Sequence, residues 1–254
     1  MRLPLALLLL LGAATAPHLL RVDDREIAWV EAGNPAKTPI LFIHGSPGSS
    51  GAWRGYLRSP ALTRVAHLIA VDRPGFGASE PGQAETSVQT QARLIHEVLQ
   101  ATSGGQRAIV VGHSLGGPVA ARLAMDYPEA VCGLLLLAAT IDPDFEHPRW
   151  YNRLASKRWF AWTLSPEMLA SNDEIMPLKG ELEAMRPLWP RVDMPTIVLH
   201  GTRDGLVPVE NADFAERVLV NAEVVRIDGA DHFLPWKNAA LVDESLAKLL
   251  SRCP

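Results

Sequence analysis

One serine in this sequence has neighbours whose types and spacing could support nucleophilic chemistry. Gly112-His113-Ser114-Leu115-Gly116 follows the apolar run 108–111 and precedes a helical pattern at 118–125. A serine on a sharp strand-to-helix turn presents its hydroxyl above the sheet, and flanking glycines leave room for the neighbouring backbone. A G-x-S-x-G pattern arises by chance in about one chain of this length in ten. The strand before it and the helix after it favour Ser114 as a nucleophile.

A serine hydroxyl is a weak nucleophile, so it needs a base within hydrogen-bond reach and a third group that orients the base. His232 follows the predicted strand 223–227, and Asp204 follows the predicted strand 196–199. The carboxyl ends of parallel strands lie at one edge of a sheet, where Ser114 also emerges. We therefore predict a catalytic triad of Ser114, His232 and Asp204.

Other acidic residues and histidines are candidates for the same roles. Asp142 follows a predicted strand that ends at residue 139, and it is the alternative acid. Asp228 and Asp231 are expected to cap the turn before the following helix. The other histidines are expected to be non-catalytic: His18, His44, His67, His96, His113, His147 and His200.

A second loop could stabilise an oxyanion. His44-Gly45-Ser46-Pro47-Gly48 follows the predicted strand 39–43. Acyl transfer passes through a tetrahedral oxyanion that two backbone N–H groups can bind. We assign these donors to Ser46 and Leu115. Pro47 removes a donor and stiffens the loop, and the bond before it can adopt the cis form.

The elements that must position these residues alternate along the chain. Continuous apolar runs are typical of strands buried on both faces of a parallel sheet, and helical patterns separate them. The alternation predicts an α/β fold with a mostly parallel sheet covered by helices on both faces. The predicted strands are a hairpin at 19–31 and runs at 39–43, 65–71, 108–111, 134–139, 196–199 and 223–227, with helices at 89–99, 118–125, 211–220 and 239–250.

One stretch breaks this alternation. Between residues 139 and 195 no strand run occurs, and about fifty residues are too many for a plain loop in a compact domain. We predict a small helical cap insertion at about 141–190. Most of its aromatic residues are expected to anchor the core of the cap itself, with one or two lining a pocket: Phe145, Trp150, Tyr151, Trp159, Phe160, Trp162 and Trp189.

Composition limits the classes of partner. The chain has 254 residues, of which 48% are hydrophobic, and this predicts a single domain over 17–254. The net charge of -4 and the scattered basic residues argue against a nucleic-acid partner. Cys132 and Cys253 lack metal-ligand spacing, and whether they pair is open. The motifs imply no cofactor and no metal.

The first sixteen residues have the pattern of a secretory signal peptide. Arg2 precedes an apolar run at 3–11, and small residues follow at 12–16. The run is too short to span a bilayer, so no stable membrane span is expected. We predict cleavage after Ala14 or Ala16 and export to the periplasm or the exterior. An uncleaved anchor and a cytoplasmic location are the alternatives.

Together these segments resemble the α/β-hydrolase superfamily, from about residue 19 to residue 250. The matching segments are 44–47, Asp72-Arg73-Pro74-Gly75-Phe76-Gly77-Ala78-Ser79, the turn at Ser114, Asp204 and His232. Segment 44–47 is also similar to that of epoxide hydrolases and haloalkane dehalogenases, which would imply an aspartate nucleophile. Here the nucleophile position holds Ser114, and the cap has one tyrosine where epoxide opening in that family uses two. Both activities are therefore disfavoured.

The resemblance implies a serine hydrolase that cleaves carboxylic esters through an acyl-enzyme. The aromatic cap and Phe233-Leu234-Pro235-Trp236 favour a small-molecule ester with an apolar acyl or alcohol group. Alternatives on the same triad are a carbon–carbon bond hydrolase and a cofactor-free perhydrolase. A non-catalytic binding protein is the alternative from another class, but such proteins often lose a triad member. The acyl preference, the natural substrate and the oligomeric state stay open.

Overall fold

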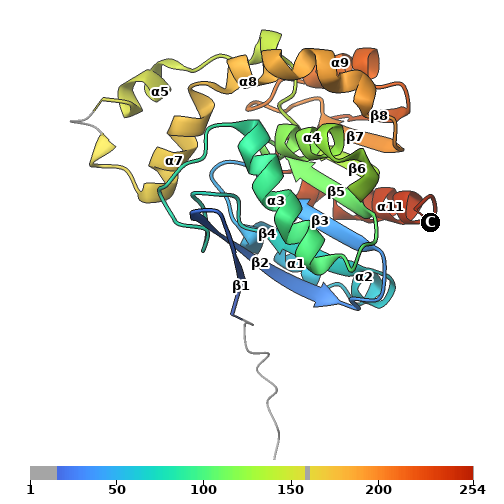
Figure 1. Ribbon diagram of the computed structural model, residues 1–254. Coiled ribbons are helices and arrows are strands. Elements are labelled where there is room, and N and C mark those ends of the chain that lie inside the picture. Colours follow the sequence, from blue (N-terminus) through green and yellow to red (C-terminus); the bar gives the residue numbers. More distant parts are fainter. Residues whose placement is uncertain (1–15, 158–160, 254) are drawn as a thin grey trace, which may run out of the picture.

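A single sheet organises the protein. The computed structural model describes residues 16–157 and 161–253, and its sheet has eight strands in the order β1-β2-β4-β3-β5-β6-β7-β8 (Figure 1). β2 pairs antiparallel with β1 and with β4, and all other neighbours are parallel. The strands are β1 (His18–Val22), β2 (Arg25–Gly33), β3 (Pro39–Ile43), β4 (His67–Val71), β5 (Ala108–His113), β6 (Val131–Leu137), β7 (Thr196–Gly201) and β8 (Ala222–Ile227).

Helices cover both faces of the sheet. Side chains alternate between faces along a strand, so Leu41 of β3 packs in one hydrophobic cluster with α3 and α4, while Phe42 packs in the other with α1 and α11. Every residue of β3 is buried as a result. The helices are α1 (Arg54–Leu57), α2 (Pro60–Val65), α3 (Val88–Thr102), α4 (Gly116–Asp126), α5 (Trp150–Ala155), α7 (Pro166–Ile175), α8 (Leu178–Met185), α9 (Glu210–Val218), α10 (Leu234–Lys237) and α11 (Ala239–Leu250).

The predicted fold class is confirmed, although several element boundaries shift by a few residues. The apolar run 65–71 predicts a strand from Val65, but Val65 ends α2 and β4 begins at His67. Ser59 caps α2 by accepting the Leu62 N–H, and Pro60 stands in its first turn. These local signals favour a helix over a strand for the residues before the buried run.

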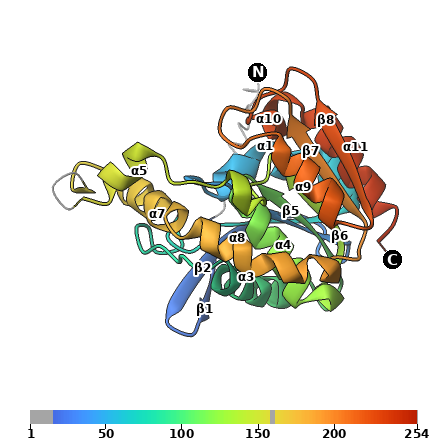
Figure 2. The same ribbon diagram turned by 90° about the horizontal axis from the view of Figure 1, so that it is seen from above.

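The region between β6 and β7 is helical wherever the structure describes regular elements in it. α5 and α7 project beyond the body of the sheet, while α8 lies beside α4 (Figures 1 and 2). None of the helices among residues 16–157 and 161–253 is long and apolar enough to cross a membrane. The predicted signal segment falls almost wholly on residues 1–15, outside the described residues, and stays a prediction.

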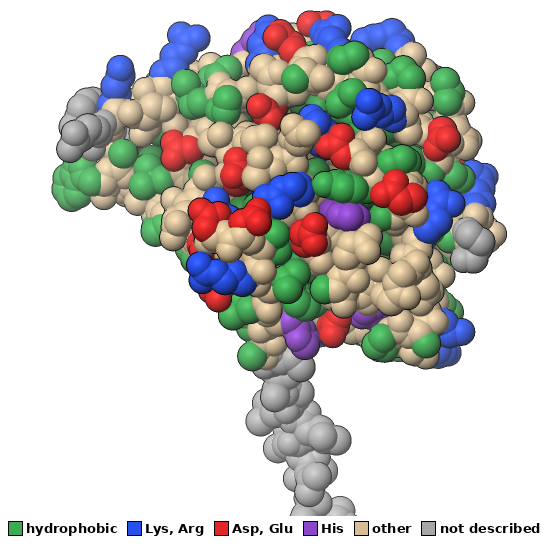
Figure 3. Space-filling view, viewed as in Figure 1, with side chains coloured by type: hydrophobic (Ala, Val, Ile, Leu, Met, Phe, Trp, Pro, Cys, Tyr) green, Lys and Arg blue, Asp and Glu red, His purple; other side chains and the backbone are tan. Residues whose placement is uncertain are grey.

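The expected aromatic core of the cap is wrong for most of the described side chains, because Phe145, Trp150, Tyr151 and Trp162 are exposed. Trp189 is buried and packs against Phe214. Trp150 and Trp162, however, are 75% and 80% exposed, and hydrophobic side chains reach the surface of the projecting cap at the left of Figure 3. α5 buries only Asn152, because a short helix that projects from the body has little to pack against. Trp159 and Phe160 lie outside the described residues.

A disulfide joins the two cysteines whose pairing the sequence leaves open. Cys132 on β6 bonds Cys253 after α11, across a separation of 121 residues. Closing a loop of this length restricts the unfolded chain, so replacing both cysteines by alanine should lower the free energy of unfolding by about 4 kcal/mol. Urea denaturation measures this, with reduced wild-type protein as the control. A difference below about 1 kcal/mol would contradict the expected contribution.

Candidate active site

Ser114 sits on a strained turn between β5 and α4. Its φ is 54°, in the left-handed region that side chains other than glycine rarely adopt. A Cβ on Gly112 would lie 2.4 Å from the Gly116 carbonyl oxygen, and one on Gly116 would lie 2.5 Å from the Ile43 carbonyl oxygen. The flanking glycines are therefore required by close backbone approach, as the motif predicts. This turn holds the Ser114 hydroxyl at the end of β5.

His232 and Asp204 contact each other across the ends of β7 and β8. The Nδ1 of His232 lies 2.8 Å from Oδ2 of Asp204, and both side chains are buried. Asp204 Oδ1 accepts the N–H groups of Leu206 and Val207 at 2.9 and 2.8 Å. Burial raises the pKa of Asp204, but the hydrogen bonds from His232, Val207 and Leu206 outweigh burial and leave the pKa below its usual value. The ionised carboxylate is suited to orienting the imidazole.

Asp142 serves a different turn. Its Oδ1 accepts the Asp144 N–H at 3.0 Å, and its Oδ2 lies 3.5 Å from Nη2 of Arg217. In the described part of the chain, no hydrogen bond or ion pair joins Asp142 to His232. Asp231 accepts the Phe233 N–H at 3.0 Å, which confirms its expected turn-capping role.

A cavity of about 490 Å³ brings the sequence-predicted residues together. Ser114, Leu115, Ser46 and His232 all line it. In the described part of the chain, neither the Ser46 nor the Leu115 N–H donates to a backbone carbonyl. Both donors thus remain available beside Ser114. The bond between Ser46 and Pro47 is cis.

The walls of this cavity are mainly apolar, with a polar patch. Phe233 and Trp236, expected from the sequence to indicate an apolar site, are half exposed and do not line the cavity in the described structure. The Glu146 carboxylate on the polar side accepts from Thr140 Oγ1, and burial raises its pKa. Cap side chains form most of the apolar wall: Ala155, Leu164, Met168, Ile175 and Leu178.

His113 supports the base, a role that the sequence does not predict. Its Nε2 lies 3.1 Å from the His232 carbonyl oxygen, and the two rings are 4.8 Å apart. Burial, together with the neighbouring His232, lowers the pKa of His113 to about 4, so the ring stays neutral at pH 7. The position of His113 directly before Ser114 was the sequence feature that could have indicated this role.

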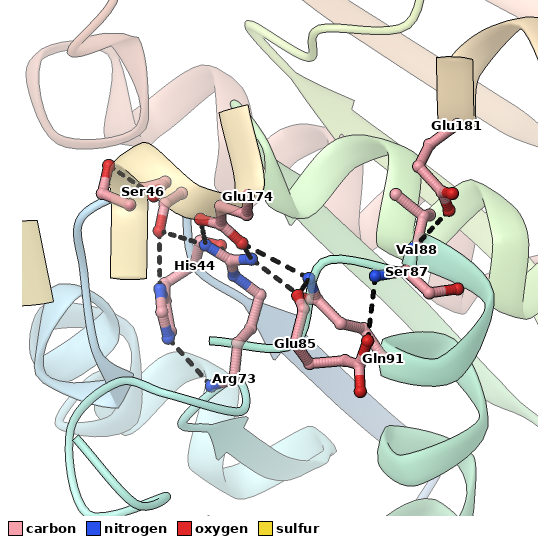
Figure 4. Close-up of polar contacts among 11 residues, drawn as sticks. His44, Ser46, Arg73, Glu85, Ser87, Val88, Gln91, Glu174 and Glu181 are labelled. Carbon is pink, nitrogen blue, oxygen red and sulfur yellow. Dashed lines mark hydrogen bonds and ion pairs between the residues drawn. The ribbon is translucent and has the colours of Figure 1, made fainter. Parts of the chain in front are cut away.

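A buried ion pair beneath the Ser46 loop was also missed. Arg73 is 0% exposed and Glu174 is 2% exposed, and their side chains lie 2.7 Å apart at the closest atoms (Figure 4). Arg73 belongs to the 72–79 segment, which carries part of the family resemblance but none of the predicted site residues. Glu174 comes from α7 in the cap, where no motif distinguishes it from the neighbouring acidic residues Glu167 and Asp173.

A protein-family model matches the part of the chain that carries Ser46 and Ser114. The model of the alpha/beta hydrolase fold family matches residues 38–165, a span that holds the Ser46 loop and Ser114. The chain belongs to this family. Within the described residues of this α/β hydrolase, no group of three or more His, Cys, Asp or Glu side chains could hold a metal ion.

Relatives of this α/β hydrolase carry the names of different activities. It is 36% identical to a dihydrolipoyllysine-residue acetyltransferase component of the acetoin cleaving system from Cupriavidus necator over 126 residues, which cover 50% of this chain and only 33% of that protein. It is 25% identical to epoxide hydrolase 1 of Caenorhabditis elegans over 92% of this chain and 70% of that one. Among solved structures, a membrane phospholipase A is 26% identical, with a TM-score of 0.70, covering 92% of this chain and 86% of the other.

Proposed function

We propose that this α/β hydrolase is a serine esterase. The supporting observation is the shared cavity. Ser114 on its strained turn and His232, which is hydrogen-bonded to the buried Asp204, both line it. A nucleophile, a base and an orienting acid are the parts that acyl transfer requires.

In the proposed acylation, Ser114 Oγ attacks the ester carbonyl carbon while His232 accepts the hydroxyl proton. The negative charge on the carbonyl oxygen is bound by the N–H groups of Ser46 and Leu115. His232 then returns the proton to the leaving alcohol. Asp204 holds the imidazole in the tautomer that leaves Nε2 unprotonated toward the serine. The Asp204 carboxylate also stabilises the ring when it becomes charged.

Deacylation repeats these steps with water as the nucleophile. His232 removes a proton from the water, the second oxyanion occupies the same site, and Ser114 leaves with the proton that His232 gives back. The products are a carboxylic acid and an alcohol. The ester of highest activity should carry an apolar group, because cap residues such as Met168, Ile175 and Leu178 form the apolar wall.

The epoxide hydrolase among the relatives does not change this proposal. The nucleophile position holds Ser114, and Tyr151 is the only cap tyrosine in the sequence. Tyr151 is 46% exposed, although it lines the cavity. Opening an epoxide through an alkyl-serine ether would leave no carbonyl for water to attack, so the enzyme could not turn over.

A fluorophosphonate probe tests the proposal directly. The probe should phosphonylate Ser114 alone in folded protein, because only an activated serine attacks it. Intact-mass and peptide analysis locates the adduct, and heat-unfolded protein is the control. A series of nitrophenyl esters should then show rates that rise with acyl length up to what a cavity of about 490 Å³ admits. An unlabelled Ser114 in folded protein would overturn the esterase proposal.

We also propose that the protein is exported. The predicted signal peptide at 1–16 supports this location, and the disulfide between Cys132 and Cys253 fits an oxidising compartment. N-terminal sequencing of protein from the periplasm or medium should find Thr15 or Pro17 as the first residue, since cleavage is predicted after Ala14 or Ala16. Recovery of an intact Met1 in the cytoplasm would contradict export.

A further inference from the structure

The peptide group between Gly45 and Ser46 links the proposed oxyanion site to the interior of the protein. The Gly45 carbonyl oxygen lies 2.7 Å from His44 Nδ1 and accepts a hydrogen bond from Arg73 Nη2 at 3.0 Å. The C=O and N–H of a planar trans peptide point in opposite directions. Two donors on the Gly45 oxygen therefore set the direction of the Ser46 N–H.

The His44 ring can donate to that carbonyl in only one tautomer. The Arg73 backbone N–H donates to His44 Nε2 at 3.0 Å, so Nε2 is the acceptor and Nδ1 carries the proton. Burial and the Arg73 charge hold the pKa of His44 well below its usual range. The ring is thus a fixed neutral donor to Gly45.

All N–H groups of the Arg73 side chain donate hydrogen bonds in this region. Its Nε donates to the His44 carbonyl at 2.9 Å, and Nη2 donates to Gly45 and to Glu174 Oε1. Nη1 donates to Glu174 Oε2 at 2.7 Å and to Gln91 Oε1 at 3.0 Å. A guanidinium has five N–H donors, and all of them are used. Bidentate pairing with the carboxylate fixes the plane of the guanidinium, and with it the donors aimed at the loop.

The carboxylate that fixes this plane belongs to the cap. Glu174 (Figure 4) lies on α7, and Ser171, one turn earlier, accepts the Ser46 hydroxyl at 2.9 Å. α7 therefore contacts the 44–46 loop at two points, through Ser46 directly and through Arg73. Ser171 and Ile175 of the same helix also line the substrate cavity.

We propose that Arg73 and Glu174 are positioning residues that aim the Ser46 N–H at the oxyanion, so that the seating of α7 sets the catalytic rate. This inference rests on the proposed esterase function. An N–H group stabilises the oxyanion only when it points at the oxygen. The carboxylate that keeps the Ser46 N–H pointed there lies on α7, the helix that lines the substrate cavity. The pair thereby couples the cap to the chemical step.

The test compares Glu174→Gln with Glu181→Gln. Glu181 is a cap glutamate on α8 that accepts the Val88 N–H at 2.8 Å, at the start of α3 and away from the 44–46 loop. Removing one oxyanion donor lowers kcat by about 100- to 1000-fold, so misaiming one in Glu174→Gln should lower kcat by about 10- to 100-fold. KM should change by less than about threefold, because the ground-state ester gains little from this donor. Glu181→Gln should keep kcat within about twofold of wild type.

A tetrahedral inhibitor adds a readout that loss of folding would not mimic. A trifluoromethyl ketone forms an oxyanion adduct, so its inhibition constant should rise in Glu174→Gln by the same factor as kcat falls. Glu174→Asp keeps the charge on a shorter side chain and should show a smaller loss. It also serves if Glu174→Gln does not fold, as judged by circular dichroism.

The outcomes separate the two proposals. Wild-type protein that fails to label with fluorophosphonate and cleaves no ester overturns the esterase function, and this inference with it. An active wild type, with a folded Glu174→Gln that matches Glu181→Gln in kcat and in the inhibition constant, overturns the positioning role alone. If Glu174→Gln does not fold, the same match by Glu174→Asp overturns it.

Discussion

Replacing Ser114 by alanine is expected to lower kcat for ester cleavage by about 10⁴- to 10⁶-fold. The Ser114 hydroxyl is the only protein group in the proposed mechanism that bonds to the acyl carbon, so its loss removes the acyl-enzyme. The donors of Ser46 and Leu115 would remain and support a small residual rate. Initial rates with the best nitrophenyl ester measure the effect, and intact mass should show that the fluorophosphonate adduct disappears.

Ser245→Ala is the matched control for this variant. Ser245 is a buried serine on α11 whose hydroxyl donates to the Leu241 carbonyl at 2.8 Å, and it is not among the residues that line the cavity. It should keep the rate and the labelling of the wild type. Circular dichroism should show both variants folded, because alanine only has to adopt the φ that Ser114 already holds. A Ser114→Ala protein within about tenfold of wild type would show that another group is the nucleophile.

Asp204→Asn is expected to lower kcat by about 10³- to 10⁴-fold, while Asp142→Asn should stay within about threefold of wild type. Asparagine at 204 keeps the shape but offers an amide that favours the wrong tautomer of His232. Asp142 holds the turn at Asp144 instead. Initial rates of the two variants, compared at equal folded fraction, identify the acid. A large loss in Asp142→Asn alone would reverse the assignment.

Asp204→Asn should also differ from wild type in how its stability depends on pH. The pKa of Asp204 is lowered in the folded protein, so its carboxylate contributes stability that is present above the unfolded pKa. That contribution is lost as the pH falls through the folded pKa. Urea titrations of Asp204→Asn should therefore show a weaker loss of stability on acidification than wild type. An unchanged acid dependence would contradict the geometry at Asp204.

Local sequence patterns were enough to predict the succession of strands along the chain and to place the site residues at the ends of strands. The buried runs at β3, β5 and β7 are continuous because helices cover both faces, and that pattern can be read without coordinates. The glycines around Ser114 imply close backbone packing for the same reason. The prediction that Ser114 and His232 converge follows from the common edge of parallel strands. The cap was predicted only as a helical region, because its prolines and aromatic residues do not specify what they pack against.

Only the tertiary structure decided contacts between residues far apart in the chain. It paired Cys132 with Cys253, joined His232 to Asp204 rather than Asp142, and left Trp150 exposed. Arg73 and Glu174 are 101 residues apart in the chain, and no sequence motif near either residue predicts their contact. Hydrophobic periodicity indicates which face of a helix or strand is buried. The partner of a buried charged side chain depends instead on how separate helices and strands pack against one another. The sequence thus determined the chemistry proposed for this α/β hydrolase, and the structure decided which buried groups orient it.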